Sequence, residues 1–252
     1  MELKRIINHI DSYLNIGSFK DDSINGLQVE NSGFINKIGL AVDACQEAIY
    51  KAEKAGCNLL IVHHGLFWNR RQLIVGNSFQ RIRALIMADM ALYAVHIPLD
   101  AHPEIGHNRA IARLLDLDGI EPFAMYHGSY IGIKGRFKKP GSREQVAAEV
   151  EKAIGSRRGL LKFGPEKIDT VAVVAGSATD PDLFKELKDE GIDLFITGEP
   201  KHGAYHLAQE FGLNIFYGGH YQTETFGIKA LGDYLHKMFS IPVAFIDAPC
   251  FF

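Results

Sequence analysis

The sequence predicts an α/β fold in which amphipathic helices cover mostly parallel sheet. Short apolar runs alternate with helical patterns along almost the whole chain, and one series of such elements occurs twice. The composition agrees, because 47% of the 252 residues are apolar and 23% are charged, as in an ordinary globular protein. A chain of this length can bury a sizeable core without disulfide bonds.

The expected strands are short apolar runs bounded by polar or glycine-rich segments. They are Lys37–Val42, Leu59–Val62, Leu92–His96, Tyr130–Phe137, Thr170–Ala175, Leu194–Thr197, Asn214–Tyr217 and Val243–Asp247, with a turn and a further short strand within Gly155–Gly164. The expected helices carry apolar residues at helical spacing. They are a helix opening at Leu3, then Ala44–Ala55, Phe79–Met90, Asn108–Leu117, Arg143–Ile154, Pro181–Glu190, His202–Phe211 and Thr223–Met238.

One series of elements is repeated. The first copy contains "AGCNLLIVHHG" and "ALYAVHIPLD", and the second contains "EGIDLFITGEPKHG" and "LNIFYGGHYQTE", each with helices between the strands. We interpret this as an internal duplication, with chance similarity between α/β units as the alternative. The expected units are residues 1–125, with the C-terminal segment 225–252 packing on them, and residues 126–224.

Metal-competent residues follow the repeated strands. Open α/β sheets bind ligands at the carboxyl ends of their strands. His63 and His64 come directly after the apolar run Leu59–Val62. Because neighbouring side chains of a strand point to opposite sides, the two histidines could reach two ions, or one could orient the other. A hydrogen-bonded turn is the alternative, although Phe67 and Trp68 could wall off a pocket there.

Asp100 lies four residues after His96, in "HIPLDAH". Pro98 argues against a helix, so we expect a loop. An aspartate in this mostly apolar context would be costly to bury without a cation. The alternative is an N-cap of the following helix or a salt-bridged loop residue.

His220 and Glu224 lie four residues apart after Gly218 and Gly219, at the start of the last long helix. At this spacing both side chains project from one helix face. Taken alone, such a pair is more often surface electrostatics, and the combination with the other two segments favours a metal site. Imidazole and carboxylate ligands together suit Zn, Fe, Mn or Co.

The size of the combined ligand set favours two ions. Three histidines and two carboxylates exceed the three protein ligands of a typical single catalytic zinc. We therefore predict a dinuclear site with His63, His64 and His220 as terminal ligands. Either Asp100 or Glu224 would bridge, and the sequence does not choose between them.

These segments resemble the YbgI-like or Nif-three-like family, also called GTP cyclohydrolase 1 type 2 homologs. The resemblance extends over nearly the whole chain, from "DDSINGLQVE" through "LLIVHHGLFW" and "GGHYQTETFG" to "IPVAFIDAPCFF". It implies two similar, intertwined α/β/α units with a metal site in the cleft between them, and toroidal hexamers built as trimers of dimers. The same five ligands follow by position. The chain departs from the family where Gly65 replaces a frequent proline, and it lacks a long insert between the halves.

Two functions follow as hypotheses. The first is a metal-dependent hydrolase of a nucleotide or related small molecule, resembling a GTP cyclohydrolase. Glu199 and His202 would be its acid–base candidates, and His96 would orient a ligand. There is no GxxxxGK[ST] phosphate loop, HExxH motif or GxSxG motif.

The second hypothesis is a non-enzymatic metal-binding protein whose ring holds a metabolite or single-stranded nucleic acid. The net charge of -3 argues against nucleic acid. The basic run Lys134, Arg136, Lys138 and Lys139 could line a channel, although a solvated strand face is favoured. Three cysteines without a CxxC pair and the lack of a membrane-spanning run indicate a cytoplasmic protein.

Overall fold

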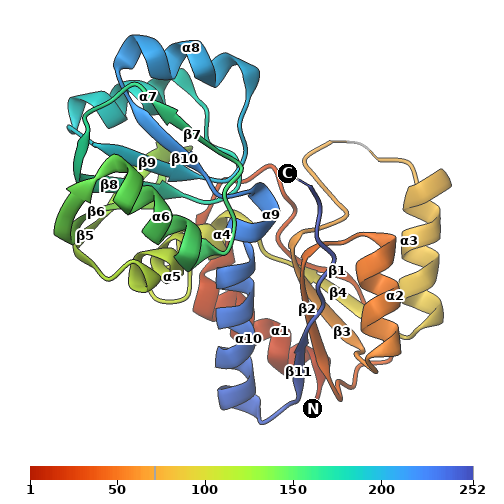
Figure 1. The fold of residues 1–252 in the computed structure, drawn as a ribbon. Coiled ribbons are helices and arrows are strands. Elements are labelled where there is room, and N and C mark those ends of the chain that lie inside the picture. Colours follow the sequence, from red (N-terminus) through yellow and green to blue (C-terminus); the bar gives the residue numbers. More distant parts are fainter. Residues whose placement is uncertain (71, 252) are drawn as a thin grey trace. The chain divides into compact units, whose positions relative to one another are not determined.

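The computed structural model describes residues 1–70 and 72–251, and the chain divides into two compact units (Figure 1). Unit 1 comprises residues 1–102 and 227–248, and unit 2 comprises residues 103–226 and 249–252. The C-terminal part of the chain thus contributes to both units, so they are intertwined along the sequence. The first boundary lies before the expected residue 125, because β5 (Leu117–Tyr126) pairs with β6 (Ser129–Ser142) of unit 2.

Unit 1 contains a five-stranded sheet in the order β1-β4-β3-β2-β11. All neighbouring strands are parallel except β1, which runs antiparallel to β4. The strands are β1 (Gly26–Val29), β2 (Ile38–Asp43), β3 (Leu59–His64), β4 (Ala91–Ala94) and β11 (Val243–Phe245). The helices are α1 (Leu3–Leu14), α2 (Gln46–Lys54), α3 (Gly76–Met87), the short α4 (Ile97–Asp100) and most of α10 (Thr225–Phe239).

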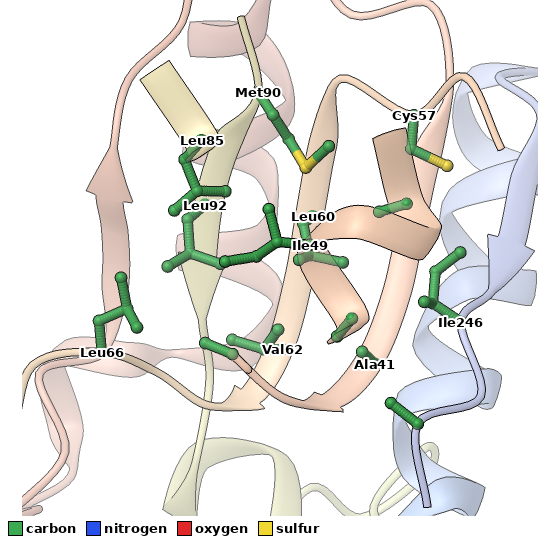
Figure 2. Close-up of a cluster of buried hydrophobic side chains, with 14 of the residues drawn as sticks. Ala41, Ile49, Cys57, Leu60, Val62, Leu66, Leu85, Met90, Leu92 and Ile246 are labelled. Carbon is green, nitrogen blue, oxygen red and sulfur yellow. The ribbon is translucent and has the colours of Figure 1, made fainter. Parts of the chain in front are cut away.

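The core on one face of this sheet explains why the apolar runs form strands. Leu60 and Val62 of β3 are fully buried and pack with Leu92 of β4 and Ile49 of α2 (Figure 2). Burying each such side chain stabilises the fold by about 1.5–3 kcal/mol. The central strands are therefore held rigidly, and the residues at their ends are held with them.

Unit 2 contains a six-stranded sheet in the order β5-β6-β8-β9-β10-β7. Among these described strands only β8, β9 and β10 are mutually parallel, so the expectation of mostly parallel sheet is wrong for this unit. Its remaining strands are β7 (Gly159–Lys162), β8 (Lys167–Val174), β9 (Leu194–Thr197) and β10 (Asn214–Tyr217). Its helices are α5 (His107–Leu114), α6 (Arg143–Ile154), α7 (Pro181–Asp189), α8 (His202–Phe211) and α9 (His220–Thr223).

The two units repeat one order of elements, which supports an internal duplication. The series α1-β1-β2-α2-β3-α3-β4-α4 corresponds to α6-β7-β8-α7-β9-α8-β10-α9. In both units the last three strands of this series are adjacent and parallel, and the first strand of the series runs antiparallel beside the last one. The fold is thus an α/β fold of two similar units, as predicted.

Strand register refines the correspondence between the halves. Leu59 pairs with Ile38 and Ala91 in unit 1, as Leu194 pairs with Val171 and Asn214 in unit 2. Helix α4 begins six residues after Ala91, and α9 begins six residues after Asn214, so Ile97 is equivalent to His220. The similar spacing of His96–Asp100 and His220–Glu224 is therefore displaced by one residue.

Two local expectations are wrong. The segment after β4 is a short helix, because Pro98 lies in its first turn, where a backbone N–H has no partner within the helix. The expected helix Thr223–Met238 is divided into α9 and α10 at Glu224. Among the described residues, no helix is long and apolar enough to cross a membrane.

Candidate metal centre

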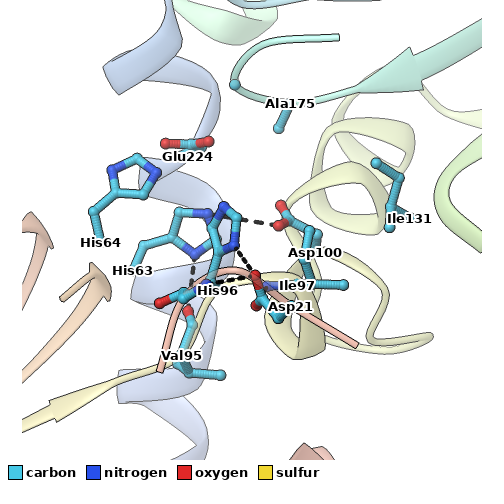
Figure 3. A network of polar contacts seen from close by, with 12 residues as sticks. Asp21, His63, His64, Val95, His96, Ile97, Asp100, Ile131, Ala175 and Glu224 are labelled. Atoms are coloured by element: carbon cyan, nitrogen blue, oxygen red, sulfur yellow. Dashed lines mark hydrogen bonds and ion pairs between the residues drawn. The ribbon is translucent and has the colours of Figure 1, made fainter. Parts of the chain in front are cut away.

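The histidine pair belongs to the end of β3. His63 is fully buried, and its Nδ1 lies 2.9 Å from the backbone oxygen of Val95 (Figure 3). Because a carbonyl oxygen only accepts, Nδ1 carries the proton and Nε2 presents the lone pair. His64 Nδ1 lies 2.9 Å from Asp43 Oδ1, a contact that follows from the pairing of β2 with β3. Such a partner on one nitrogen is typical of metal-ligating histidines.

A loop before β1 holds His96. Its Nδ1 lies 2.9 Å from Asp21 Oδ1, and its backbone N–H donates to Asn25 Oδ1 at 2.7 Å. The other carboxylate oxygen of Asp21 accepts from Ile97 N at 3.1 Å, at the start of α4. Asp21 thus fixes both the His96 ring and the short helix that carries Asp100.

The carboxyl of Asp21 is held in its charged form. Burial alone would raise its pKa, but hydrogen bonding and charge attraction from His96, with hydrogen bonds from Asn25 and the backbone of Ser23, lower that pKa to about 2. A charged acceptor at Nδ1 fixes the orientation of the imidazole ring, as is common for metal-ligating histidines. His96 therefore has the same arrangement as the histidines of β3.

Unit 1 gathers enough nitrogen and oxygen donors to hold a cation. One ring nitrogen from each of His63, His64 and His96 lies within 4.8 Å of the others. Asp100 Oδ2 lies 3.6 Å from His63 Nε2, and its side chain is 10% exposed. Imidazole nitrogens with a carboxylate suit zinc, iron, manganese or cobalt, so these residues fit the expected type of ion.

Unit 2 holds the second part of the predicted ligand set. His220 Nδ1 lies 2.7 Å from Glu199 Oε2, and its Nε2 lies 3.2 Å from Glu224 Oε1. Burial would lower the pKa of His220, but hydrogen bonds and charge attraction from Glu224 and then Glu199 raise it to about 9. Two carboxylates around one imidazole create a strongly negative environment, which a divalent cation would also satisfy.

Glycines place Glu224 in this environment. Gly176 adopts a positive φ of 70°, and a Cβ at this position would overlap Glu224 Oε1. A Cβ on Gly198 would lie 2.5 Å from the backbone oxygen of Gly176, so these two strand ends approach closely. Thr223 Oγ1 accepts from Gly176 N at 3.0 Å. Only glycine at position 176 leaves room for the 3%-exposed carboxylate of Glu224.

The predicted site residues fall into two groups. His63, His64, Asp100 and His96 converge within unit 1, whereas His220, Glu224 and Glu199 converge within unit 2. His202 is exposed at the start of α8. The coordination of ions by five of these residues, and acid–base roles for Glu199, His202 and His96, remain predictions.

The sequence interpretation missed the partners of the histidines. Asp43 ends strand β2, so the strand-end rule that selected His63 also applies to it. Asp21 and Asn25 lie in "DDSINGLQVE", a segment that supports the family resemblance but has no metal-ligand pattern of its own. No local signal connects this loop with His96, because Asp21 is 75 residues away along the chain.

The basic run on β6 is neutralised by nearby carboxylates. Lys134 Nζ lies 2.6 Å from Glu190 Oε2, Arg136 pairs with Asp169, and Lys138 Nζ lies 2.5 Å from Asp116 Oδ1. At least one partner of each pair is well exposed, so each pair contributes little to stability. This pairing supports the interpretation as a solvated strand face.

The family model described as Duf34/NIF3 (NGG1p interacting factor 3) matches residues 1–249. The chain belongs to this family. It is 38% identical over 244 residues to the GTP cyclohydrolase 1 type 2 homolog of Deinococcus radiodurans, covering 97% of this chain and 92% of that protein. It is 40% identical to the protein of the same name from Pyrococcus abyssi, covering 99% of each.

Solved structures of this family share the fold. The ybgI protein, described as of unknown function, superposes with a TM-score of 0.92 at 32% identity, covering 99% of each chain. TTHA1606 from Thermus thermophilus gives a TM-score of 0.90 at 40% identity, with full coverage of both chains.

Proposed function

We propose that this Duf34/NIF3 protein binds two divalent metal ions through His63, His64, Asp100, His220 and Glu224. We further propose that it uses them to hydrolyse a nucleotide or related small molecule. The names of its relatives, GTP cyclohydrolase 1 type 2 homolog, support the nucleotide as the first substrate class to test.

One observation carries the metal proposal. Each predicted histidine ligand has Nδ1 against an oxygen acceptor of its own unit: Val95 O for His63, Asp43 for His64 and Glu199 for His220. This arrangement makes Nε2 the coordinating nitrogen of each ring; at His220 the ion would displace the Nε2 proton, because the raised pKa keeps the metal-free ring charged. Three hydrogen bonds from different parts of the fold thus orient Nδ1 of each histidine, which supports a common role for these histidines as metal ligands.

The chain's own residues prepare such a site for hydrolysis. Divalent ions held by these residues would supply an activated water near neutral pH and polarise a carbonyl or phosphoryl oxygen. Glu199 holds the Nδ1 proton of His220, so it acts as a positioning residue in this structure. Trp68 lies at the edge of the histidine cluster, with its ring centroid 5.3 Å from that of His96.

Elemental analysis tests the metal proposal. Protein loaded separately with Zn, Mn, Fe(II) or Co and then dialysed should retain two ions per chain for at least one metal. His63→Ala should lower that number, because it removes a fully buried ligand. The matched control is His206→Ala, since His206 is an exposed histidine of α8 outside the ligand set. Unchanged metal content in the His63 variant would contradict the proposal.

Turnover tests the hydrolase proposal separately. Metal-loaded protein incubated with GTP and a panel of nucleotides should release a hydrolysed product, and His63→Ala should abolish the reaction while His206→Ala should not. Absence of turnover with every metal and nucleotide would refute the enzymatic part of the proposal and leave the metal-binding part standing.

We also propose that the chain forms a homohexamer. Large apolar side chains are exposed on and just before α3, including Leu73 at 78%, Val75 at 66% and Met87 at 76%. Several large exposed apolar side chains in one segment of the chain support a protein–protein interface there. Light scattering after size-exclusion chromatography should give six times the chain mass of 28.0 kDa. A monomer at micromolar concentration would contradict this.

A further inference from the structure

Arg158 lies next to Gly219, the residue that precedes His220. Its backbone N–H donates to the oxygen of Tyr217 at 2.7 Å, directly before the pairing of Gly159 with Tyr217 in the sheet. Since β10 ends at Tyr217 and His220 follows two glycines later, Arg158 is fixed at the strand end that carries His220.

The side chain of Arg158 runs along this turn. Gly219 has a φ of 94°, and a Cβ built on it would lie 3.4 Å from Arg158 Nε and 3.6 Å from Arg158 Cγ. The guanidinium group therefore begins next to the residue that precedes His220. Its Cζ also lies 5.1 Å from the ring centroid of Phe251, within range of a cation–π contact.

Arg158 differs from its neighbour Arg157 in having no nearby carboxylate among the described residues. Arg157 has Glu151 at 3.5 Å and Glu144 at 4.0 Å. Within residues 1–70 and 72–251, no carboxylate lies within 4.0 Å of the Arg158 guanidinium, which is exposed. The carboxylates of Glu199 and Glu224 instead contact His220. An anionic ligand near His220 would therefore be attracted by the charge of Arg158.

We propose that Arg158 binds a phosphate group of the substrate and so determines that the substrate is a phosphorylated one. This inference rests on the proposed function and names the substrate class for the same site. A guanidinium group offers parallel N–H donors that match two phosphate oxygens, and it remains charged at all physiological pH values. Contact with the 75%-exposed ring of Phe251 restrains the side chain, which reduces the entropy lost on binding.

Binding measurements on the metal-loaded full chain test this inference. Isothermal titration with GTP, guanosine and inorganic pyrophosphate is compared for Arg158→Gln and Arg157→Gln, which remove the same charge one residue apart. Arg158→Gln should weaken GTP and pyrophosphate binding about tenfold or more and leave guanosine unchanged. Arg157→Gln should change all three by less than about twofold. Phe251→Ala should weaken pyrophosphate binding by a few-fold, since it leaves the charge in place.

The inference is overturned if both arginine variants weaken pyrophosphate binding equally, or if Arg158→Gln binds it as the unaltered protein does. It is also overturned if the unaltered protein binds neither GTP nor pyrophosphate. Loss of binding in Arg158→Gln with no turnover of any nucleotide would sustain the phosphate site while refuting hydrolysis, so the two proposals fail separately.

Discussion

Replacing Gly176 by alanine should weaken the metal centre from a position that contributes no ligand. Its φ of 70° strains any side chain, and the new Cβ would also overlap Glu224 Oε1. Gly191→Ala is a matched control, because Gly191 has a φ of 63° but nothing within 4 Å of its added Cβ. The two variants share the backbone strain and differ in the contact with Glu224.

The magnitudes follow from these two effects. The left-handed conformation costs an alanine about 1–2 kcal/mol, so Gly191→Ala should lose that much stability and keep its metal. In Gly176→Ala the overlap adds about 1–3 kcal/mol of overpacking unless the Glu224 carboxylate moves. The added carbon would lie 3.1 Å from Glu224 Cδ and 3.3 Å from His220 Nε2, so both predicted ligands are affected.

Thermal unfolding and elemental analysis measure these effects. At about 2–4 °C per kcal/mol, Gly191→Ala should unfold a few degrees below the unaltered protein, and metal-free Gly176→Ala lower still. Metal affinity of Gly176→Ala should fall by about 10- to 100-fold or more, as when a ligand's supporting contacts are lost. If Gly176→Ala binds metal as tightly as Gly191→Ala, Glu224 is not held where the reasoning requires.

Three further perturbations separate the parts of the site. Trp68 is the chain's single tryptophan and lies near His64 and His96. Bound Mn or Co should therefore quench its fluorescence, and removal of the ions with EDTA should restore it. Constant emission on metal loading would show that the ions bind elsewhere. The pKa of Asp21 is about 2 in the folded protein, against an ordinary value of 3.8. Because the folded state favours the charged carboxylate, Asp21 adds about 1–2 kcal/mol to the free energy of unfolding above pH 3.8, and this stabilisation is lost as the pH falls towards 2. Urea unfolding of metal-free protein should therefore show a steeper acid dependence than Asp21→Asn, and equal slopes would contradict this. Replacing Lys134 and Lys138 together by glutamine should change the free energy of unfolding by less than about 1 kcal/mol. In filter-binding assays, both the unaltered protein and this double variant should bind single-stranded DNA no better than background. If the unaltered protein binds DNA and the double variant does not, the basic run lines a channel instead.

Most of the fold could be predicted because it is encoded locally. The apolar runs Leu194–Thr197 and Asn214–Tyr217 form strands with the expected bounds, since each is a continuous buried segment ended by glycine or polar residues. Strand β5 was missed because Gly119 and Pro122 interrupt it and most of its residues are not buried. Strand β1 has only four residues, three of them partly buried, which is too short for a periodic signal.

The sequence by itself determined the kinds of ligand and their positions at strand ends, because side-chain chemistry and strand periodicity are local properties. Only the tertiary structure decided which oxygen holds each histidine. Asp43 meets His64 through the register of β2 with β3, Asp21 reaches His96 across 75 residues, and Gly176 makes room for Glu224. These contacts depend on the order of strands in a sheet and on the path of a loop, which no spacing along the chain encodes. For the same reason the sequence does not show that Arg158 lies next to Gly219, because the two residues meet only through the pairing of β7 with β10.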